Sequence, residues 1–285
     1  MLNLGGNSRQ SLSAIRVVLD GKLKGLSAIE CTAVSAELFN VLLALQSSGA
    51  LRRAVTDPAR EHEAKSALVT DLFGKSLSKS TLDLVNQLVA LRWSRTTDIV
   101  HAIEQLAVEA EATAANTDDS LDSVEEELFA FSKVLVANND LRQALNSSLD
   151  SGDHKAELIK AIFGGKYKPS SVRLLEQLVR VLQRRSIELA LLAFIHGITA
   201  RHNRLRAVVL SRSELSPAQR EKLASTLTKQ MGQPVHVSVE IDASVIGGVA
   251  VRFDDEVIDG TISNRLAEAS RALAVKEFST SPSRD

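Results

Sequence analysis

The sequence predicts a mainly α-helical protein in which two tandem helical bundles are followed by a small α/β module. One reason is an internal repeat: between residues 34–110 and 124–200, 19 of 77 positions are identical at a constant offset of 90. The other is a change of periodicity, because apolar and polar residues alternate from Val235 to Ile241 as in a half-buried strand. The expected domains are residues 1–96 and 97–204 for the bundles, 205–276 for the module and 277–285 for a flexible tail.

Each copy of the repeat has the pattern of several short helices. Leu84 and Leu88 form an apolar stripe that recurs as Leu174 and Leu178. In the first copy, Asp57 followed by Pro58 is typical of a helix start. Gly74 and its counterpart Gly164 predict left-handed C-terminal stops.

One helix is expected to belong to both bundles. Residues 9–20 have the apolar spacing of an opening helix, and adding 90 brings this segment to residues 99–110. Those residues are also expected to close the first bundle. Because no Gly or Pro interrupts them, we predict one long helix, roughly residues 97–114, that the two bundles share. The polar, acidic residues 116–123 that follow predict a loop.

The C-terminal module has the pattern strand, helix, strand, strand, helix. Residues 205–210 are typical of a strand, and Ser216 with Gln219 forms the capping box of a helix that ends at Gly232. Further strands are expected over residues 235–241, 249–253 and 257–258. Thr261 is expected to cap a final helix whose apolar face contains Ile262, Leu266, Ala269 and Leu273.

The stretch from Ile241 to Leu266 resembles the C-terminal signature of the delta subunit of F-type ATP synthases, whose mitochondrial relative is the oligomycin-sensitivity-conferring protein. Each element is common in isolation, and the specific feature is their order over about thirty residues. The residues that carry the resemblance are Ile241, Asp242, Val245, Gly247, Gly248, Val249, Val251, Arg252, Val257, Ile258, Asp259, Gly260, Arg265 and Leu266.

This resemblance implies a non-catalytic stator subunit without cofactors, at the cytoplasmic face of the cell membrane as a peripheral protein. In the family, the helical bundle holds N-terminal helices of the alpha subunits, and the C-terminal module meets the C-terminal helices of the b subunits. Residues 94–274 cover that whole plan. The additional residues 1–93 resemble actinobacterial delta subunits, which have a duplicated bundle and are in some cases fused to a membrane-anchored stalk segment. We expect the second bundle to hold another alpha-subunit helix or to brace the b subunits.

Composition limits the classes of function. The net charge of −1 provides no basic surface for nucleic acid at the level of the whole chain. Cys31 is the single cysteine, which excludes an intramolecular disulfide and fits a reducing cytoplasm. No signal peptide is expected at the N-terminus. The apolar run at residues 187–200 is shorter than the roughly 20 residues of a spanning helix, so we expect no direct membrane span.

We find no pattern typical of catalysis. The chain lacks the GxxxxGK[ST] loop that binds nucleotide phosphates, and its six histidines have no metal-ligand spacing. Residues 254–256 are three acids that favour a solvated turn over a cation site. Trp93 is open to two interpretations, as an anchor for a partner or as a packing residue. The alternative functions are a helical-repeat adaptor unrelated to ATP synthase, which leaves the signature unexplained, and an enzyme, which would need a polar pocket.

Overall fold

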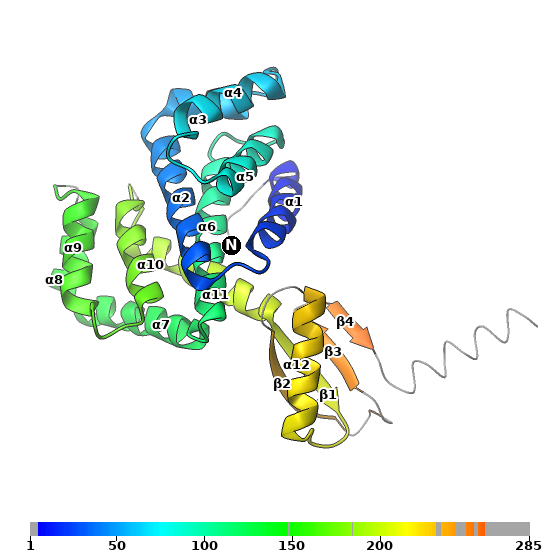
Figure 1. The fold of residues 1–285 in the computed structure, drawn as a ribbon. Helices are drawn as coiled ribbons and strands as arrows, with labels where there is room; N and C mark the ends of the chain where they lie inside the picture. Colours follow the sequence, from blue (N-terminus) through cyan, green and yellow to red (C-terminus); the bar gives the residue numbers. More distant parts are fainter. Residues whose placement is uncertain are drawn as a thin grey trace, which may run out of the picture. The chain divides into compact units, whose positions relative to one another are not determined.

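The chain divides into two compact units, residues 1–202 and residues 203–285. The computed structural model describes residues 5–147, 149–183, 185–231, 235–242, 245, 249–253 and 256–259. The described part of the first unit is helical, and that of the second combines a helix with a sheet (Figure 1). The predicted class, mainly α with a small α/β module, is therefore confirmed. Both predicted bundles lie within the first unit, and the boundary between residues 96 and 97 stays a prediction.

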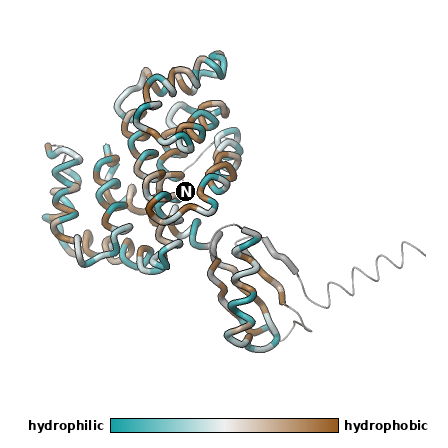
Figure 2. The backbone as a smooth tube through the Cα atoms, viewed as in Figure 1, coloured by the Kyte–Doolittle hydropathy of each residue, from teal (hydrophilic) through white to brown (hydrophobic). Residues whose placement is uncertain are grey.

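The first unit consists of helices that follow the repeat. They are α1 (Gly6–Leu23), α2 (Ala28–Ser47), α3 (Gly49–Thr56), α4 (His62–Phe73), α5 (Lys79–Ala90), α6 (Asp98–Thr117), α7 (Leu121–Ala137), α8 (Asn139–Asn146), α9 (Gly152–Phe163), α10 (Pro169–Arg180) and α11 (Ile187–Leu205). Helices α3, α4 and α5 begin and end 90 residues before α8, α9 and α10. Hydrophobic and hydrophilic residues are interleaved along these helices (Figure 2), as expected where one face of a helix is buried.

A carboxylate from a distant helix caps the same helix in both copies. Glu37 in α2 accepts hydrogen bonds from the Ser78 backbone N–H (2.9 Å) and hydroxyl (2.8 Å), at the start of α5. Glu127 in α7 accepts one from the Lys168 N–H (2.9 Å), at the start of α10. A negative charge at a helix N-terminus satisfies free N–H groups and complements the helix dipole. The repeat thus preserves a tertiary contact as well as a helix pattern.

Helix α6 occupies the centre of the first unit. It packs against α1 and α2 from the first copy and against α7 and α10 from the second. As a result, 16 of its 20 residues are buried. The predicted long helix shared between the bundles is confirmed by these contacts.

The link between α6 and α7 is shorter than the predicted loop over residues 116–123. Asn116 is buried in the last turn of α6, and α7 already begins at Leu121. The connection needs only three residues because Asp119 adopts a left-handed backbone (φ 56°) and the Ser120 N–H donates back to the Ala115 carbonyl (2.7 Å). Polarity indicated a loop, but burial against neighbouring helices extended both helices into it.

The repeat loses its register before α11. Seven residues connect α5 to α6, whereas six connect α10 to α11. The buried stripe of α11 contains Ile187, Ala190, Leu191, Phe194 and Ile198. It coincides with the buried residues Ile99, Ala102, Ile103, Leu106 and Ala110 of α6 at an offset of 88 rather than 90. The gapless alignment therefore ends before the last helix of each copy, because packing fixes which face of a helix is buried.

Two local predictions for the first copy are wrong. Helix α4 begins at His62, not after Asp57, because the Asp57 carboxylate accepts from the Ala59 N–H (2.9 Å) and forms a turn first. Gly74 ends α4 with φ −59° rather than a left-handed conformation. The same prediction is wrong in the second copy, where Gly164 ends α9 with φ −57°. A Cβ at Gly74 would lie 2.5 Å from the Thr70 carbonyl oxygen, so the close approach of backbone explains this glycine.

Helix α2 is the one described helix with the length and apolar composition of a membrane span. The prediction of no membrane span considered residues 187–200, but α2 is longer, with 20 residues. In the structure, α2 runs along α6 and buries Val34, Leu38 and Leu42 within the first unit. These contacts are those of a core helix.

The second unit contains a four-stranded sheet and one described helix. Its elements are β1 (Arg206–Ser211), α12 (Pro217–Met231), β2 (His236–Ile241), β3 (Val249–Phe253) and β4 (Glu256–Asp259). The strand order is β2-β1-β3-β4, with β1 parallel to β2 and the other pairs antiparallel. The core is formed by Ala207, Val209, Leu227, Val235 and Val251.

The predicted capping box of α12 is confirmed. The Ser216 hydroxyl accepts from the Gln219 N–H (3.3 Å), and the Gln219 side chain accepts from the Ser216 N–H (2.8 Å). The predicted final helix after Thr261, Gly232 and the acidic residues 254 and 255 lie outside the described residues.

The repeat offers a matched pair of core variants. Phe39 is 1% exposed and its ring stacks on Phe194 at 6.0 Å, whereas its counterpart Phe129 is 47% exposed. We expect Phe39→Ala to lower the free energy of unfolding by roughly 3–5 kcal/mol, because it leaves a cavity. Phe129→Ala should cost about 1 kcal/mol or less. Urea unfolding followed by circular dichroism would measure both, and equal losses would contradict this assignment of the core.

Candidate functional site

Four buried carboxylates on α6 organise the first unit. Asp98, Glu104, Glu109 and Glu111 each lie at 5% side-chain exposure or less. Each is paired with an arginine, from four different segments: Arg95 (3.0 Å), Arg185 (2.5 Å), Arg16 (2.9 Å) and Arg173 (2.6 Å), respectively. In the sequence these acids are typical of a solvated face, and only the tertiary partners reveal their role. A buried carboxylate without such a partner would be strongly unfavourable.

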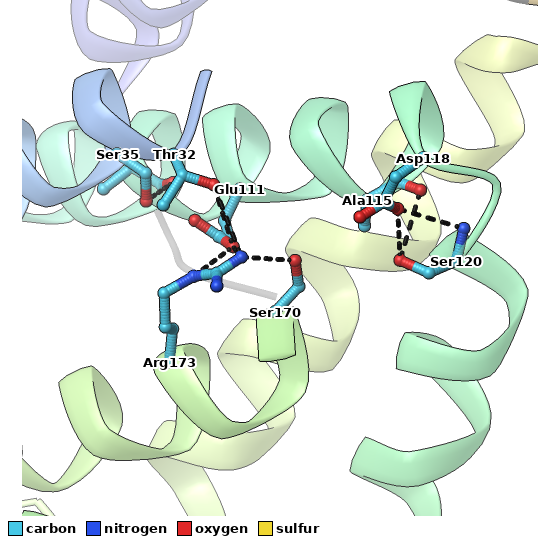
Figure 3. A network of polar contacts seen from close by, with 9 residues as sticks. Thr32, Ser35, Glu111, Ala115, Asp118, Ser120, Ser170 and Arg173 are labelled. Atoms are coloured by element: carbon cyan, nitrogen blue, oxygen red, sulfur yellow. Dashed lines mark hydrogen bonds and ion pairs between the residues drawn. The ribbon is translucent and has the colours of Figure 1, made fainter. Parts of the chain in front are cut away.

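The pair between Glu111 and Arg173 joins three helices (Figure 3). Arg173, from α10, donates two hydrogen bonds to Glu111 of α6, at 2.9 and 2.6 Å. The same guanidinium donates to Ser170 (2.8 Å), and the Thr32 hydroxyl of α2 lies 3.5 Å from Glu111. Helix α2, from the first copy, is thereby held against the shared helix α6 and against α10 of the second copy.

Further contacts continue this surface of α2. The Ser35 hydroxyl donates to the Ala107 carbonyl of α6 (2.8 Å), and the Gln46 side chain donates to the Val181 carbonyl just after α10 (3.2 Å). From Thr32 to Gln46, α2 therefore lies along α6 and α10. The surface that these two helices would otherwise expose is covered from within the chain.

Arg201 is a fully buried cation on α11. Its side chain is 0% exposed and forms an ion pair with Asp20 of α1. Its Nε donates to the Thr113 hydroxyl of α6 (3.0 Å). The last helix of the second copy is thus tied to the first helix of the first copy.

Glu104 has a perturbed acidity. Burial would raise the pKa of its carboxyl group, but the contacts with His101 and Arg185 outweigh burial and hold the pKa below the usual value. Arg185 makes two hydrogen bonds to this carboxylate, at 2.9 and 2.5 Å, whereas the His101 ring nitrogen lies 4.0 Å away. The ionised carboxylate is therefore part of the folded state.

Several large apolar side chains are exposed in the first unit, and two of the surfaces on which they lie are those of α1 and of the α7–α11 pair. On α1, Val17 is 71% exposed. Between α7 and α11 lies a groove of about 390 Å³, next to which Val136 is 81% and Leu192 51% exposed. A second cavity, of about 610 Å³, lies between α1, α6 and α11 and is lined by Arg16, Glu104 and other polar groups together with leucines. Exposed apolar surface of this kind marks candidate docking sites.

The described signature residues lie around the sheet of the second unit. Ile241 ends β2 and is exposed, and the Asp242 N–H donates to the Ser211 carbonyl (2.9 Å). Val245 and Val251 are buried, while Arg252 lies 3.9 Å from Glu240 on the surface. Val249 packs at the edge of the core, and Val257, Ile258 and Asp259 belong to β4, which pairs with β3. Gly247, Gly248, Gly260, Arg265 and Leu266 lie outside the described residues, and the role of the set stays a prediction.

Trp93 is anchored within its own bundle. Its indole N–H donates to the Leu88 carbonyl at the end of α5 (3.1 Å), which favours the packing interpretation.

Within the described ranges, no group of three or more His, Cys, Asp or Glu side chains is arranged to hold a metal ion.

The fold and these surfaces define a class of protein: a helical-repeat subunit, joined to a small α/β module, that works through contacts with other chains. The model of the ATP synthase delta (OSCP) subunit family matches residues 109–273. The ATP synthase subunit delta of Streptomyces griseus is 38% identical over 267 residues, which cover 94% of this chain and 98% of that protein. The subunit delta of Streptomyces coelicolor is 38% identical over 274 residues, or 96% and 100% of the two chains. That of a Parafrankia species is 36% identical over 275 residues, or 94% and 99%.

The chain belongs to the ATP synthase delta (OSCP) subunit family. It is a structural stator subunit of an F-type ATP synthase and not an enzyme, and it associates peripherally with the membrane complex. The matches to these curated relatives cover most of the extra N-terminal residues as well. A solved chain from the Toxoplasma gondii mitochondrial ATP synthase hexamer is 16% identical, with a TM-score of 0.28 that is too low to inform the fold. Family membership excludes the unrelated adaptor.

The low pKa of Glu104 predicts a pH-dependent contribution to stability. A carboxyl group whose pKa is lowered on folding stabilises the folded state above its unfolded pKa, near 4.5, and this contribution is lost as the pH falls through the folded value. We expect Glu104→Gln to cost roughly 1.5–3 kcal/mol at pH 7. The difference from the wild type should narrow below pH 4.5.

Urea unfolding from pH 7 to pH 3 would measure this difference. Glu188→Gln is the control, because Glu188 is 40% exposed and lies 4.0 Å from Arg142, so its loss should cost less than about 1 kcal/mol. A difference for Glu104→Gln that stays constant with pH would show that its charge does not contribute.

Proposed function

We propose that this chain ties the catalytic head of the synthase to its membrane-anchored b subunits at the cytoplasmic face of the membrane. In this proposal the first unit binds an alpha-subunit N-terminal helix, and the C-terminal module binds the C-terminal helices of b. Torque from the rotor would otherwise turn the head. Helix-in-groove contacts suit this task because several apolar anchors share the load.

The alpha-subunit helix is assigned to the α1–α5 face, which we define by Val17, Gly21, Asp83 and Gln87. The observation that carries the assignment is the position of α2 on the second copy. At an offset of 90, the α1–α5 face corresponds to Ala107 and Glu111 of α6 and to Arg173 and Gln177 of α10. That surface is covered by α2, whereas Val17, Gly21, Asp83 and Gln87 are all exposed.

The two surfaces are built alike. An ion pair bridges the same two helices in each copy, with the charges exchanged: Lys22 and Asp83 lie 3.6 Å apart, and Glu111 and Arg173 lie 2.6 Å apart. At Gly21, a Cβ would have no neighbour within 4 Å, so a partner helix can approach α1 closely. A helix with a small-residue and aliphatic face, like α2, would fit there.

The same observation argues against a second open groove of this type. The α6–α10 surface is the equivalent of the α1–α5 face, and it is occupied by α2. The proposal is therefore that one alpha-subunit helix binds at the α1–α5 face.

The C-terminal module offers a surface for the b subunits. Strand β2 lies at an edge of the sheet, and its last residue, Ile241, is 61% exposed. An exposed large aliphatic side chain beside an edge strand is a natural anchor for a partner helix.

A single charge on α1 tests the alpha-subunit site. We expect Val17→Glu in the full chain to weaken binding of a peptide with the alpha-subunit N-terminal sequence by at least about tenfold, because it places a charge in the apolar contact. Fluorescence anisotropy would measure the affinity. Ile29→Glu is the control, since Ile29 is 83% exposed at the start of α2 and outside this face. Unchanged binding by Val17→Glu would rule out the α1–α5 face.

The stator role itself is tested in membrane vesicles depleted of this chain. Adding the purified chain back should restore ATP-driven proton pumping, while ATP hydrolysis by the released head proceeds without it. Proton pumping that needs no added chain would contradict the proposal.

A further inference from the structure

The internal repeat contains an interface between its two copies, and the described residues leave the equivalent surface of the second copy exposed. In the first copy, α2 and α6 bind residues 181–185, the segment that follows α10. Gln46 of α2 donates to the Val181 carbonyl (3.2 Å), and Glu104 of α6 accepts two hydrogen bonds from Arg185. The first copy thus uses two polar side chains to hold the second.

In the second copy, the corresponding helices are α7 and α11. The position of Gln46 is taken by Val136, at an offset of 90, and that of Glu104 by Leu192, at the offset of 88 that the burial of α11 defines. Val136 is 81% exposed and Leu192 is 51% exposed. Both polar anchors have therefore become aliphatic at the surface where no third copy follows.

These two residues flank the groove of about 390 Å³ between α7 and α11. Its apolar lining consists of Leu135, Val136, Ala137, Leu191, Leu192 and Ile195. The charged side chains along it are Lys133 and Glu188, one from each helix. The terminal repeat of a repeat protein normally presents a polar outer face, because an apolar one would promote aggregation. An apolar groove at this position indicates a surface that is covered in the assembled protein.

We propose that the α7–α11 groove binds a helix of another subunit of the synthase, at a site separate from the α1–α5 face. The occupant is an amphipathic helix with aliphatic side chains three and four residues apart, which would replace the polar contacts seen in the first copy by apolar ones. An acidic residue next to its apolar stripe would face Lys133. The inference rests on the proposed function in one respect: the partner helix is taken to come from the synthase.

Cysteine protection tests this site in the assembled synthase. Cys31 is fully buried, and burial raises the pKa of its thiol to about 11, so an introduced surface cysteine is the reactive one. We expect Val136→Cys to react with a maleimide at least about tenfold more slowly in the membrane-bound synthase than in the free chain, because the partner helix covers it. Leu149→Cys is the control, since Leu149 is 95% exposed outside the groove and should react equally in both states.

A benzophenone maleimide attached to Val136→Cys would identify the occupant. Cross-links to one helix of another synthase subunit, at positions three or four residues apart, are the expected result. Equal reactivity of Val136→Cys in both states, or cross-links to a second copy of this chain, would overturn the proposal. Val17→Cys in the same assay distinguishes the two sites. If Val17→Cys is protected and Val136→Cys is not, the result supports the alpha-subunit site and refutes this one.

Discussion

The first unit depends on the burial of α6, of which 16 of 20 residues are buried. A helix buried to this extent must satisfy the polar side chains that it buries, and α6 buries four carboxylates. Each is paired with an arginine from a different segment, so that these segments meet α6 in one arrangement. Buried ion pairs add little net stability once desolvation is counted, but loss of one partner is costly. The pairs therefore restrict which helices can pack on α6 more than they strengthen the packing.

This arrangement makes the two copies of the repeat unequal partners in one structure. Helix α2 belongs to the first copy, yet it contacts α10 and stacks Phe39 on Phe194 of α11. Its counterpart α7 has no further copy to contact, and there Phe129, Val136 and the neighbouring Leu192 are exposed. Duplication thus created an internal interface on one copy and left the equivalent surface of the other available to different chains. For a stator subunit, packing of both copies on α6 would connect the two proposed docking surfaces within one unit.

Much of the fold could be predicted from the sequence, because the 90-residue identity and the apolar spacing are local patterns. The shared helix, the α/β module and the capping box at Ser216 follow from residues close together in the chain. The helix start at His62 could not be predicted, because Asp57 forms a turn instead of capping a helix. The short link after Thr117 could not be predicted either, because Asn116 is polar and yet buried in α6. The candidate docking surfaces also escaped prediction, because a packing stripe and a binding stripe have the same spacing. What separates them is the exposure of Val17, Val136 and Leu192 in the folded chain.

By itself, the sequence determined the helical class, the repeat and the family, because all three depend on residue identities and their order. The tertiary structure alone decided that α2 covers the α6–α10 surface, that acids on α6 are paired rather than solvated, and that α11 is two residues out of register. The first of these features depends on contacts between residues as far as 141 positions apart, such as Thr32 and Arg173. No local pattern encodes such a contact, since the same Asp or Arg is equally compatible with a solvated helix face.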